Sequence, residues 1–199
     1  IPAPRAGTLR NLFVRHNSAA GNGNGVAYTV MVNGVATAIT VILGQLVSGG
    51  QARKLTAQLV ERYGETHSLN GKVVYSFPVP SRLAKANLSS LSTTKKRKET
   101  IRLLSAKIAS GEIILNPHQD VLNLKKQLFQ IPGIGPWTVE YIGMRCLGDP
   151  DSFPSSDLIL RRILKTETNL RLNEVKPWRS YAAYLLWENE DPQPKKAVQ

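Results

Sequence analysis

A turn of the form Pro-Gly-Ile-Gly-Pro, at residues 132–136, constrains the fold of this chain more than any other stretch. Apolar residues flank it on both sides, with Leu128 and Phe129 before the turn and Trp137 after it. Proline interrupts a helix, and glycine adopts backbone conformations that other residues resist. Pro136 can also open the next helix, because proline is favoured at the first helical position. The pattern therefore predicts two helices joined by a tight hairpin.

The same turn is suited to binding a phosphate. Because Gly133 and Gly135 carry no side chains, the backbone N–H groups on either side of Ile134 can approach a phosphate oxygen closely. The N-terminus of the following helix adds a favourable potential for an anion. Such a hairpin binds a nucleic-acid backbone without reading its sequence. An ordinary turn between two packed helices is the alternative, and the turn alone does not decide between the two.

The charge of the chain favours a polyanionic partner. Its 199 residues include 26 Lys and Arg against 14 Asp and Glu, a formal net charge of +12. Such a balance is typical of proteins that bind nucleic acid or an anionic membrane surface. The chain contains no apolar run of the roughly 20 residues that cross a bilayer, and its first residues lack the layout of a signal peptide. We therefore expect a cytoplasmic, nucleoid-associated protein without a membrane partner.

Cysteine and histidine usage argues against a metal centre. Cys146 is the only cysteine, so the chain can form neither an internal disulfide nor a four-cysteine iron–sulfur cluster. His16, His67 and His118 are scattered without the spacing of metal ligands. We expect no metal and no required cofactor.

Residues 1–41 predict strands. The stretches "VAYTVMV" and "VATAITV" are separated by "NG", a dipeptide that favours a tight β-hairpin. Residues 34–43 remain ambiguous, because they could equally form the first half of a helix. We expect a β-hairpin-like N-terminal segment over residues 1–41 and a flexible tail over 191–199.

From about Ile42 the pattern predicts helices. Apolar residues recur at helical spacing in four segments, residues 48–65, 94–112, 118–131 and 176–190. In the last segment Pro177 suits the first helical position, and we expect Trp178 and Tyr181 to pack in the core. The sequence therefore predicts a mainly α helical bundle over 42–190, preceded by a short β-rich segment.

The segment from Ile42 to Trp187 resembles the helix–hairpin–helix superfamily of DNA glycosylases, and within it the 3-methyladenine DNA glycosylase II branch, which acts on alkylated bases. Four patches carry the resemblance, in family order: "ILGQLVSGGQARKLTAQLVERYGE", "IPGIGPWTVEYIGMRCLGD", "SFPSSDLILRR" and "KPWRSYAAYLLW". An aspartate 22 residues beyond Gly135 also fits the family. Family members carry a larger N-terminal domain, so we expect residues 1–41 to be a truncated or fused segment.

The resemblance implies that Asp157 is the catalytic aspartate. An ionised carboxylate beside the sugar stabilises the positive charge that develops as a base departs, or orients the attacking water. The alternative is that Asp157 caps a helix, and the two roles can coexist. In relatives that also cut the backbone, a lysine forms a Schiff base two positions after the last hairpin glycine, where this chain has Trp137. A monofunctional enzyme that leaves an abasic site is implied.

The resemblance also implies a pocket for a flipped base, lined by Trp137, Tyr141 and Trp187. Electron-rich rings suit a base made cationic by alkylation, whereas simple core packing of these aromatic residues is the alternative. Leu46 matches the apolar wedge that fills the gap left in the duplex. Gln45 beside it could contact the opposite strand or cap a turn.

The basic run that contains Lys95, Lys96 and Arg97 begins a predicted helix and could contact phosphate, although such a run is more often a solvated face. By family analogy, carbonyl groups near Gln130 and Ile131, together with that of Ile134, could coordinate a monovalent cation.

Taken together, these features predict a monomeric, monofunctional glycosylase that excises alkylated purines such as 3-methyladenine from double-stranded DNA by base flipping. A non-catalytic helix–hairpin–helix DNA-binding module is the alternative.

Overall fold

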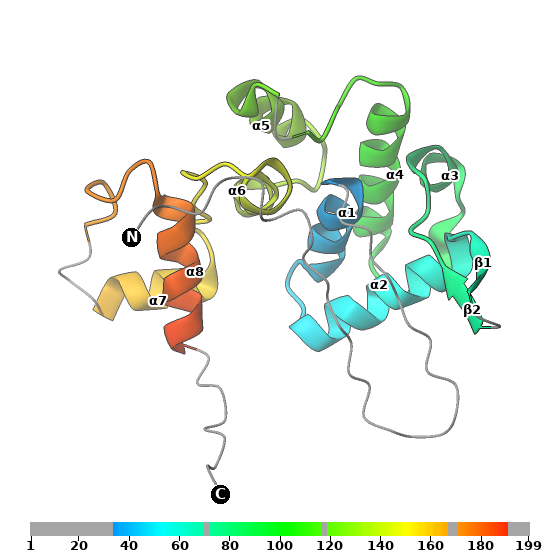
Figure 1. The fold of residues 1–199 in the computed structure, drawn as a ribbon, viewed down its shortest axis with the longest axis horizontal. Coiled ribbons are helices and arrows are strands. Elements are labelled where there is room, and N and C mark those ends of the chain that lie inside the picture. Colours follow the sequence, from blue (N-terminus) through cyan, green and yellow to red (C-terminus); the bar gives the residue numbers. More distant parts are fainter. Residues whose placement is uncertain (1–33, 70–71, 117–118, 167–170, 191–199) are drawn as a thin grey trace, which may run out of the picture.

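The computed structural model describes residues 34–69, 72–116, 119–166 and 171–190. The strands predicted before residue 34 and the tail predicted over 191–199 lie outside these ranges. In the described part of the chain the fold is mainly α, as predicted, with one small pair of strands (Figure 1).

The elements follow one another along the chain as a series of helices interrupted once by a β-hairpin. They are α1 (Gly34–Gly44), α2 (Gly49–Tyr63), β1 (Thr66–Leu69), β2 (Lys72–Tyr75), α3 (Pro80–Lys85), α4 (Lys95–Ala109), α5 (Val121–Phe129), α6 (Pro136–Ile142), α7 (Leu158–Thr166) and α8 (Arg179–Glu190). The two strands are antiparallel, with Thr66 opposite Tyr75. A 3₁₀ turn spans Leu88–Ser90, and a π turn, Gly143–Leu147, directly continues α6.

The prediction of a strand over the last part of residues 1–41 is wrong, because residues 34–44 form helix α1. Ala38, Ile39 and Ile42 are fully buried in it, and α1 contacts α2, α4 and α6. A short apolar run rich in β-branched residues has no clear period, so it does not distinguish a buried strand from a buried helix. Packing against α2, α4 and α6 favours the helix, and the second interpretation of residues 34–43 is the correct one.

The main core surrounds α1 and includes the predicted apolar faces of three other helices. Leu55 and Leu59 of α2, Ile101 of α4, and Leu124 and Leu128 of α5 are all buried in it. Local sequence explains where these helices start, since the side chains of Ser48, Thr94 and Asp120 accept hydrogen bonds from backbone N–H groups of the first turns of α2, α4 and α5.

A second, smaller core lies between α7 and α8. Met144, Phe153, Leu160 and Ala183 form it. Figure 1 shows these two helices at the opposite end of the molecule from β1, β2 and α3, with α6 between the two ends. Because α6 touches the main core and leads directly into Met144, the segment from α6 to α8 connects the two cores.

Helix α8 differs from its prediction in two respects. It begins at Arg179, and Pro177 lies in the turn before it. Trp178 and Tyr181, which we expected in the core, are 50% and 43% exposed, and their rings pack on each other at 5.8 Å. Apolar residues occur all around α8, so their spacing does not identify the buried face. The face that contains Ala183 packs on the second core instead.

Candidate active site and DNA-contacting surface

The predicted hairpin is present, as residues 130–135 between the end of α5 and the start of α6. Its two glycines serve different purposes. Gly133 has a φ of +93°, and a Cβ atom there would lie 2.1 Å from Oγ1 of Thr100. Gly135 has a φ of −97°, which any residue adopts, and a Cβ atom there would meet nothing within 4 Å. The expectation that both glycines need an unusual backbone conformation therefore holds for Gly133 and is wrong for Gly135.

The hairpin is anchored to the rest of the protein on the side of α4. The Thr100 hydroxyl lies 2.8 Å from the carbonyl oxygen of Pro132 and 2.9 Å from that of Lys96, so it can donate to either. The side chain of Ile134 is only 4% exposed and belongs to the main core. Of Ile134, therefore, the backbone rather than the side chain is suited to meet DNA.

Asp157 accepts hydrogen bonds from four N–H groups. Its Oδ1 accepts from the backbone N–H groups of Ile159, at 3.0 Å, and Leu160, at 3.2 Å, so it caps the first turn of α7. The indole Nε1 of Trp187 donates to the same oxygen at 3.2 Å, and the indole Nε1 of Trp137 donates to Oδ2 at 2.9 Å. The structure thus combines the cap that we considered as an alternative with contacts to two of the predicted pocket residues.

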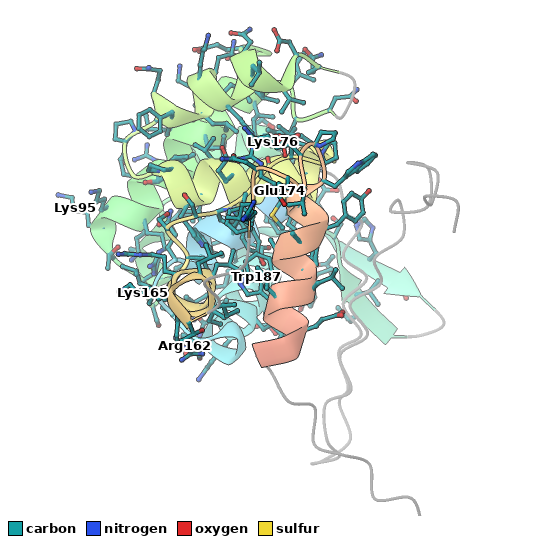
Figure 2. All side chains as sticks on the ribbon, turned by 90° about the vertical axis from the view of Figure 1, so that its left-hand side faces the viewer. Lys95, Arg162, Lys165, Glu174, Lys176 and Trp187 are labelled. Carbon is teal, nitrogen blue, oxygen red and sulfur yellow. The ribbon has the colours of Figure 1, made fainter. Side chains whose placement is uncertain are left out.

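The three predicted pocket residues form one aromatic wall, consisting of Trp137, Tyr141 and Trp187. The first two rings stack at 4.9 Å with an interplanar angle of 29°. The ring of Tyr141 lies 5.7 Å from that of Trp187, which projects from α8 (Figure 2). All three side chains are only partly buried, with Trp137 and Tyr141 packed against the main core and Trp187 against the second core. Helices α6 and α8 thus bring the wall and Asp157 together.

Two further residues border this wall, and the sequence analysis did not identify them. Tyr184 meets the ring of Trp187 edge-on at 6.0 Å. The Arg145 guanidinium lies 4.6 Å from the ring centre of Tyr184 and 5.5 Å from that of Tyr141. Burial raises the pKa of the Tyr184 hydroxyl. Arg145 was detectable in principle, because it follows Trp137 and Tyr141 at the same four-residue spacing.

Ion pairs hold the segment that precedes α7. The Lys125 ammonium lies 3.0 Å from Glu140 and 2.7 Å from Asp149. For Asp149, burial opposes ionisation, but hydrogen bonds from Lys125 and Ser152 outweigh it and lower the pKa. No local sequence signal links these residues, which belong to α5, α6 and the loop after the π turn.

A second contact of the same kind joins this loop to α8. The Arg179 guanidinium donates two hydrogen bonds to the Asp151 carboxylate, at 2.7 and 2.6 Å, and these bonds lower the pKa of Asp151. The neighbouring Ser180 hydroxyl contacts the carbonyl oxygens of Asp149 and Ser152. The loop that leads to Asp157 and the helix that carries Trp187 are thereby fixed to each other.

The predicted wedge residue lies in the turn that leads from the last residue of α1, Gly44, to Val47, and we call residues 44–47 the wedge turn. Leu46 is 97% exposed and has a φ of +54°, a region that leucine rarely occupies. The side-chain amide of Gln45 donates to the carbonyl oxygen of Gly133 at 3.0 Å and to the hydroxyl of Thr138 at 2.8 Å. Gln45 therefore joins the wedge turn to the hairpin, a role that neither of its predicted alternatives included.

The three basic residues predicted to contact DNA have different environments. Lys95 and Lys96 are exposed at the start of α4, and Figure 2 shows Lys95 pointing away from the molecule. Arg97 is half-buried, and its guanidinium donates to the backbone oxygen of Gln45 and, at 2.7 Å, to the hydroxyl of Thr93. Burial lowers the pKa of Arg97. Only the two lysines of this set are presented to a ligand in solution.

Among the described residues, none of the helices has the length and apolar character needed to span a bilayer. In the same part of the chain, no group of three or more His, Cys, Asp or Glu side chains is arranged to hold a metal ion. Cys146 is buried, and burial raises the pKa of its thiol to about 12.

Most of the chain is similar in sequence to known proteins, although no family model matches it. It is 37% identical over 159 residues to the probable bifunctional transcriptional activator/DNA repair enzyme AlkA of Mycobacterium tuberculosis, an alignment that covers 75% of this chain and 32% of the relative. It is 34% identical over 166 residues to DNA-3-methyladenine glycosylase 2 of Escherichia coli, covering 80% of this chain and 58% of the relative. The chain thus spans less than two thirds of either relative.

The fold also occurs in solved structures. The 3-methyladenine DNA glycosylase Mag1 of Schizosaccharomyces pombe, solved in complex with abasic DNA, matches with a TM-score of 0.63 at 19% identity, covering 87% of this chain and 86% of that one. MBOgg1, solved in complex with a low-affinity DNA ligand, matches with a TM-score of 0.69 at 22% identity, covering 80% and 60%. At these identities the matches show the fold alone.

Proposed function

Because the chain belongs to the helix–hairpin–helix DNA glycosylase superfamily, in its 3-methyladenine branch, we propose that it is a monofunctional DNA glycosylase. It excises alkylated purines such as 3-methyladenine from double-stranded DNA and leaves an abasic site. One observation carries this proposal: a carboxylate, Asp157, lies against an aromatic wall and accepts hydrogen bonds from two of its three rings.

The two oxygens of Asp157 are suited to different tasks. Oδ1 already accepts three N–H groups, whereas Oδ2 accepts one, from Trp137. A carboxylate oxygen accepts about two hydrogen bonds, so Oδ2 has the remaining capacity. We assign to Oδ2 the task of facing the sugar and orienting the attacking water. The backbone of α7 and the two indoles hold the carboxylate in place, so little reorganisation is needed when charge develops.

The reaction breaks the N-glycosidic bond and forms a bond from water to C1′ of the sugar. The bonding electron pair leaves with the base, so a base that alkylation has made cationic departs as a neutral molecule. The sugar carries positive charge in the transition state, which the Asp157 carboxylate stabilises, and the proton that the attacking water loses passes to the surrounding solvent. Residue 137 is tryptophan, which cannot form a Schiff base, so the DNA backbone stays intact.

The aromatic wall supplies the selection of the base. Ring faces attract positive charge and stack on a purine, so Trp137, Tyr141 and Trp187 favour a cationic purine over a neutral one. The base must leave the duplex to reach the wall, and Leu46 is exposed where an apolar side chain could fill the gap.

Contact with the DNA backbone is sequence-independent in this proposal. The open space around Gly135 lets a phosphate approach the hairpin, and the exposed Lys95 and Lys96 add positive charge. A monovalent cation on the hairpin carbonyls, among them that of Ile131, would strengthen the same contact. Because the proposed substrate is DNA, we propose that the protein acts on the nucleoid in the cytoplasm. We also propose that it acts as a monomer, since all residues of the proposed site come from one chain.

The test is release of free 3-methyladenine from methylated duplex DNA by the wild type and by Asp157→Asn. Asparagine is also a good N-cap, so the variant should fold and bind DNA while losing base release. Strand breaks should appear only after alkali, because the product is an abasic site. Base release by Asp157→Asn at the wild-type rate would disprove the catalytic role. A wild type that binds DNA, with no preference for damage and no base release, would be the non-catalytic binding module instead.

A further inference from the structure

Arg97 differs from Lys95 and Lys96 because it is half-buried and its guanidinium bonds to groups of the protein itself. It donates to the Thr93 hydroxyl through Nη1 and to the backbone oxygen of Gln45 through Nη2. Its Nε is buried and has no hydrogen-bond partner in the structure. Two of its five N–H groups are thus bonded within the protein, and a third, on Nε, is buried away from any ligand. Its position is therefore better explained by the protein than by DNA.

The Gln45 oxygen that accepts from Arg97 belongs to the wedge turn, and few contacts within this turn stabilise its conformation. The backbone hydrogen bonds of the wedge turn, from Gln45 to Ile42 and from Val47 to Gly44, are both long, at 3.4 Å. Leu46 holds a positive φ and is almost fully exposed, so its side chain contributes little packing. Contacts from outside the turn must therefore hold its conformation.

Helix α4 supplies contacts to the wedge turn and to the hairpin from neighbouring positions. Arg97 bonds to Gln45 in the wedge turn, and Thr100, three residues later, packs against Gly133 and contacts Pro132. The Gln45 side chain joins the wedge turn directly to the hairpin by donating to the Gly133 carbonyl. One rigid helix thus sets the spacing between the two turns.

We propose that Arg97 is a positioning residue, which fastens the wedge turn to α4 so that Leu46 is presented in a fixed position relative to the hairpin. The use of Leu46 as a wedge rests on the proposed function, whereas the fastening itself is a property of the free protein. Arg97 then contributes to base flipping through Leu46, and it does not contact phosphate.

The fastening can be measured without DNA, by hydrogen–deuterium exchange of the full chain. Arg97→Met keeps an unbranched apolar stem but removes the donors, and we expect amides 44–48 to exchange about ten-fold faster than in the wild type. Lys96→Met, the matched control at an exposed neighbouring position, should leave this segment unchanged. Unchanged exchange in Arg97→Met would overturn the proposal. Arg97→Lys, which keeps the charge, should also exchange faster, because an ammonium lacks the guanidinium's fork and cannot bond both acceptors in the same geometry.

A DNA measurement separates fastening from phosphate contact. The probe is a duplex that carries a tetrahydrofuran abasic analogue beside 2-aminopurine, so no chemistry is needed. Lys96→Met should reduce the slope of log affinity against log salt by about 0.9, the value expected for one lost phosphate contact. Arg97→Met should keep the wild-type slope but show less 2-aminopurine fluorescence, because Leu46 enters the duplex less often.

A slope reduced by about 0.9 in Arg97→Met would overturn the proposal in favour of a phosphate contact. A wild type that does not bind this duplex would instead count against the proposed function. The exchange experiment would still decide whether Arg97 fastens the turn, so the two failures are distinguishable.

Discussion

The surroundings of Asp157 and the wedge turn show two different ways of holding a residue in place. Asp157 accepts hydrogen bonds from four N–H groups, contributed by α6, α7 and α8. Leu46 is 97% exposed in a backbone conformation that leucine rarely adopts, and the bonds that support its turn come from Gln45 and Arg97. Asp157 is thus held by hydrogen bonds to its own side chain, whereas Leu46 is held only through the backbone and the neighbours of its turn.

The difference follows from what each residue is proposed to meet. A carboxylate that stabilises a developing charge is most effective when its hydrogen bonds are already in place before the reaction. An apolar wedge must remain free until it enters the duplex, so its own side chain cannot be packed beforehand. The support of a wedge must therefore come through its backbone and its neighbours.

The largest effect among the following changes is expected when one donor to Asp157 is removed. Trp187→Phe keeps an aromatic ring but loses the indole N–H that bonds to Oδ1. A hydrogen bond to a charged group contributes about 1.5–3 kcal/mol, so the single-turnover rate of base release should fall roughly 10- to 100-fold. Trp178→Phe is the control, because Trp178 is exposed and its ring packs on Tyr181. Equal rates for the two variants would show that the indole N–H does not hold the carboxylate.

A smaller effect on rate, combined with a gain in stability, is expected at the wedge turn. Leu46→Asn should lower base release about ten-fold, because the apolar wedge is lost. Asparagine tolerates a positive φ, so urea unfolding should show about 0.5–1 kcal/mol more stability than in the wild type. Leu46→Ala should lower release similarly without this gain, since alanine does not relieve the backbone. If Leu46→Asn is less stable than Leu46→Ala, the positive φ of Leu46 is not a strained conformation.

The smallest effect is expected for the pH dependence of stability at the Asp151–Arg179 contact. This contact supports the surroundings of Asp157 and does not involve the wedge turn. The guanidinium lowers the pKa of Asp151 in the folded protein, so the contact stabilises the fold above the unfolded pKa and is lost as pH falls through the folded one. Asp151→Asn should therefore be less stable than the wild type at pH 7. The difference should shrink below about pH 4, the ordinary range of an aspartate.

Urea unfolding of both proteins across this pH range is the measurement for that contact, with hydrogen exchange of residues 44–48 as the control. The wedge turn should exchange equally in Asp151→Asn and the wild type. A stability difference that is independent of pH would show that the charge of Asp151 does not contribute.

The amino-acid sequence by itself determined the elements whose signals are local. The proline and glycine pattern at 132–136 placed the hairpin between α5 and α6, and helical spacing identified the buried faces of α2, α4 and α5. The separation of Gly135 and Asp157 along the sequence, together with the family resemblance, indicated the site. These signals can be read from the chain because turn chemistry and helical periodicity act within a few residues.

The tertiary structure decided what depends on distant partners. Residues 34–44 form a helix that buries most of its apolar side chains in the core, and Trp178 and Tyr181 stay at the surface because α8 packs through another face. A run of basic residues does not reveal that Arg97 bonds to Gln45, 52 positions earlier in the chain. A basic residue has the same local sequence signal whether it contacts DNA or holds another part of the protein in place. Only its neighbours in the folded structure distinguish these two roles.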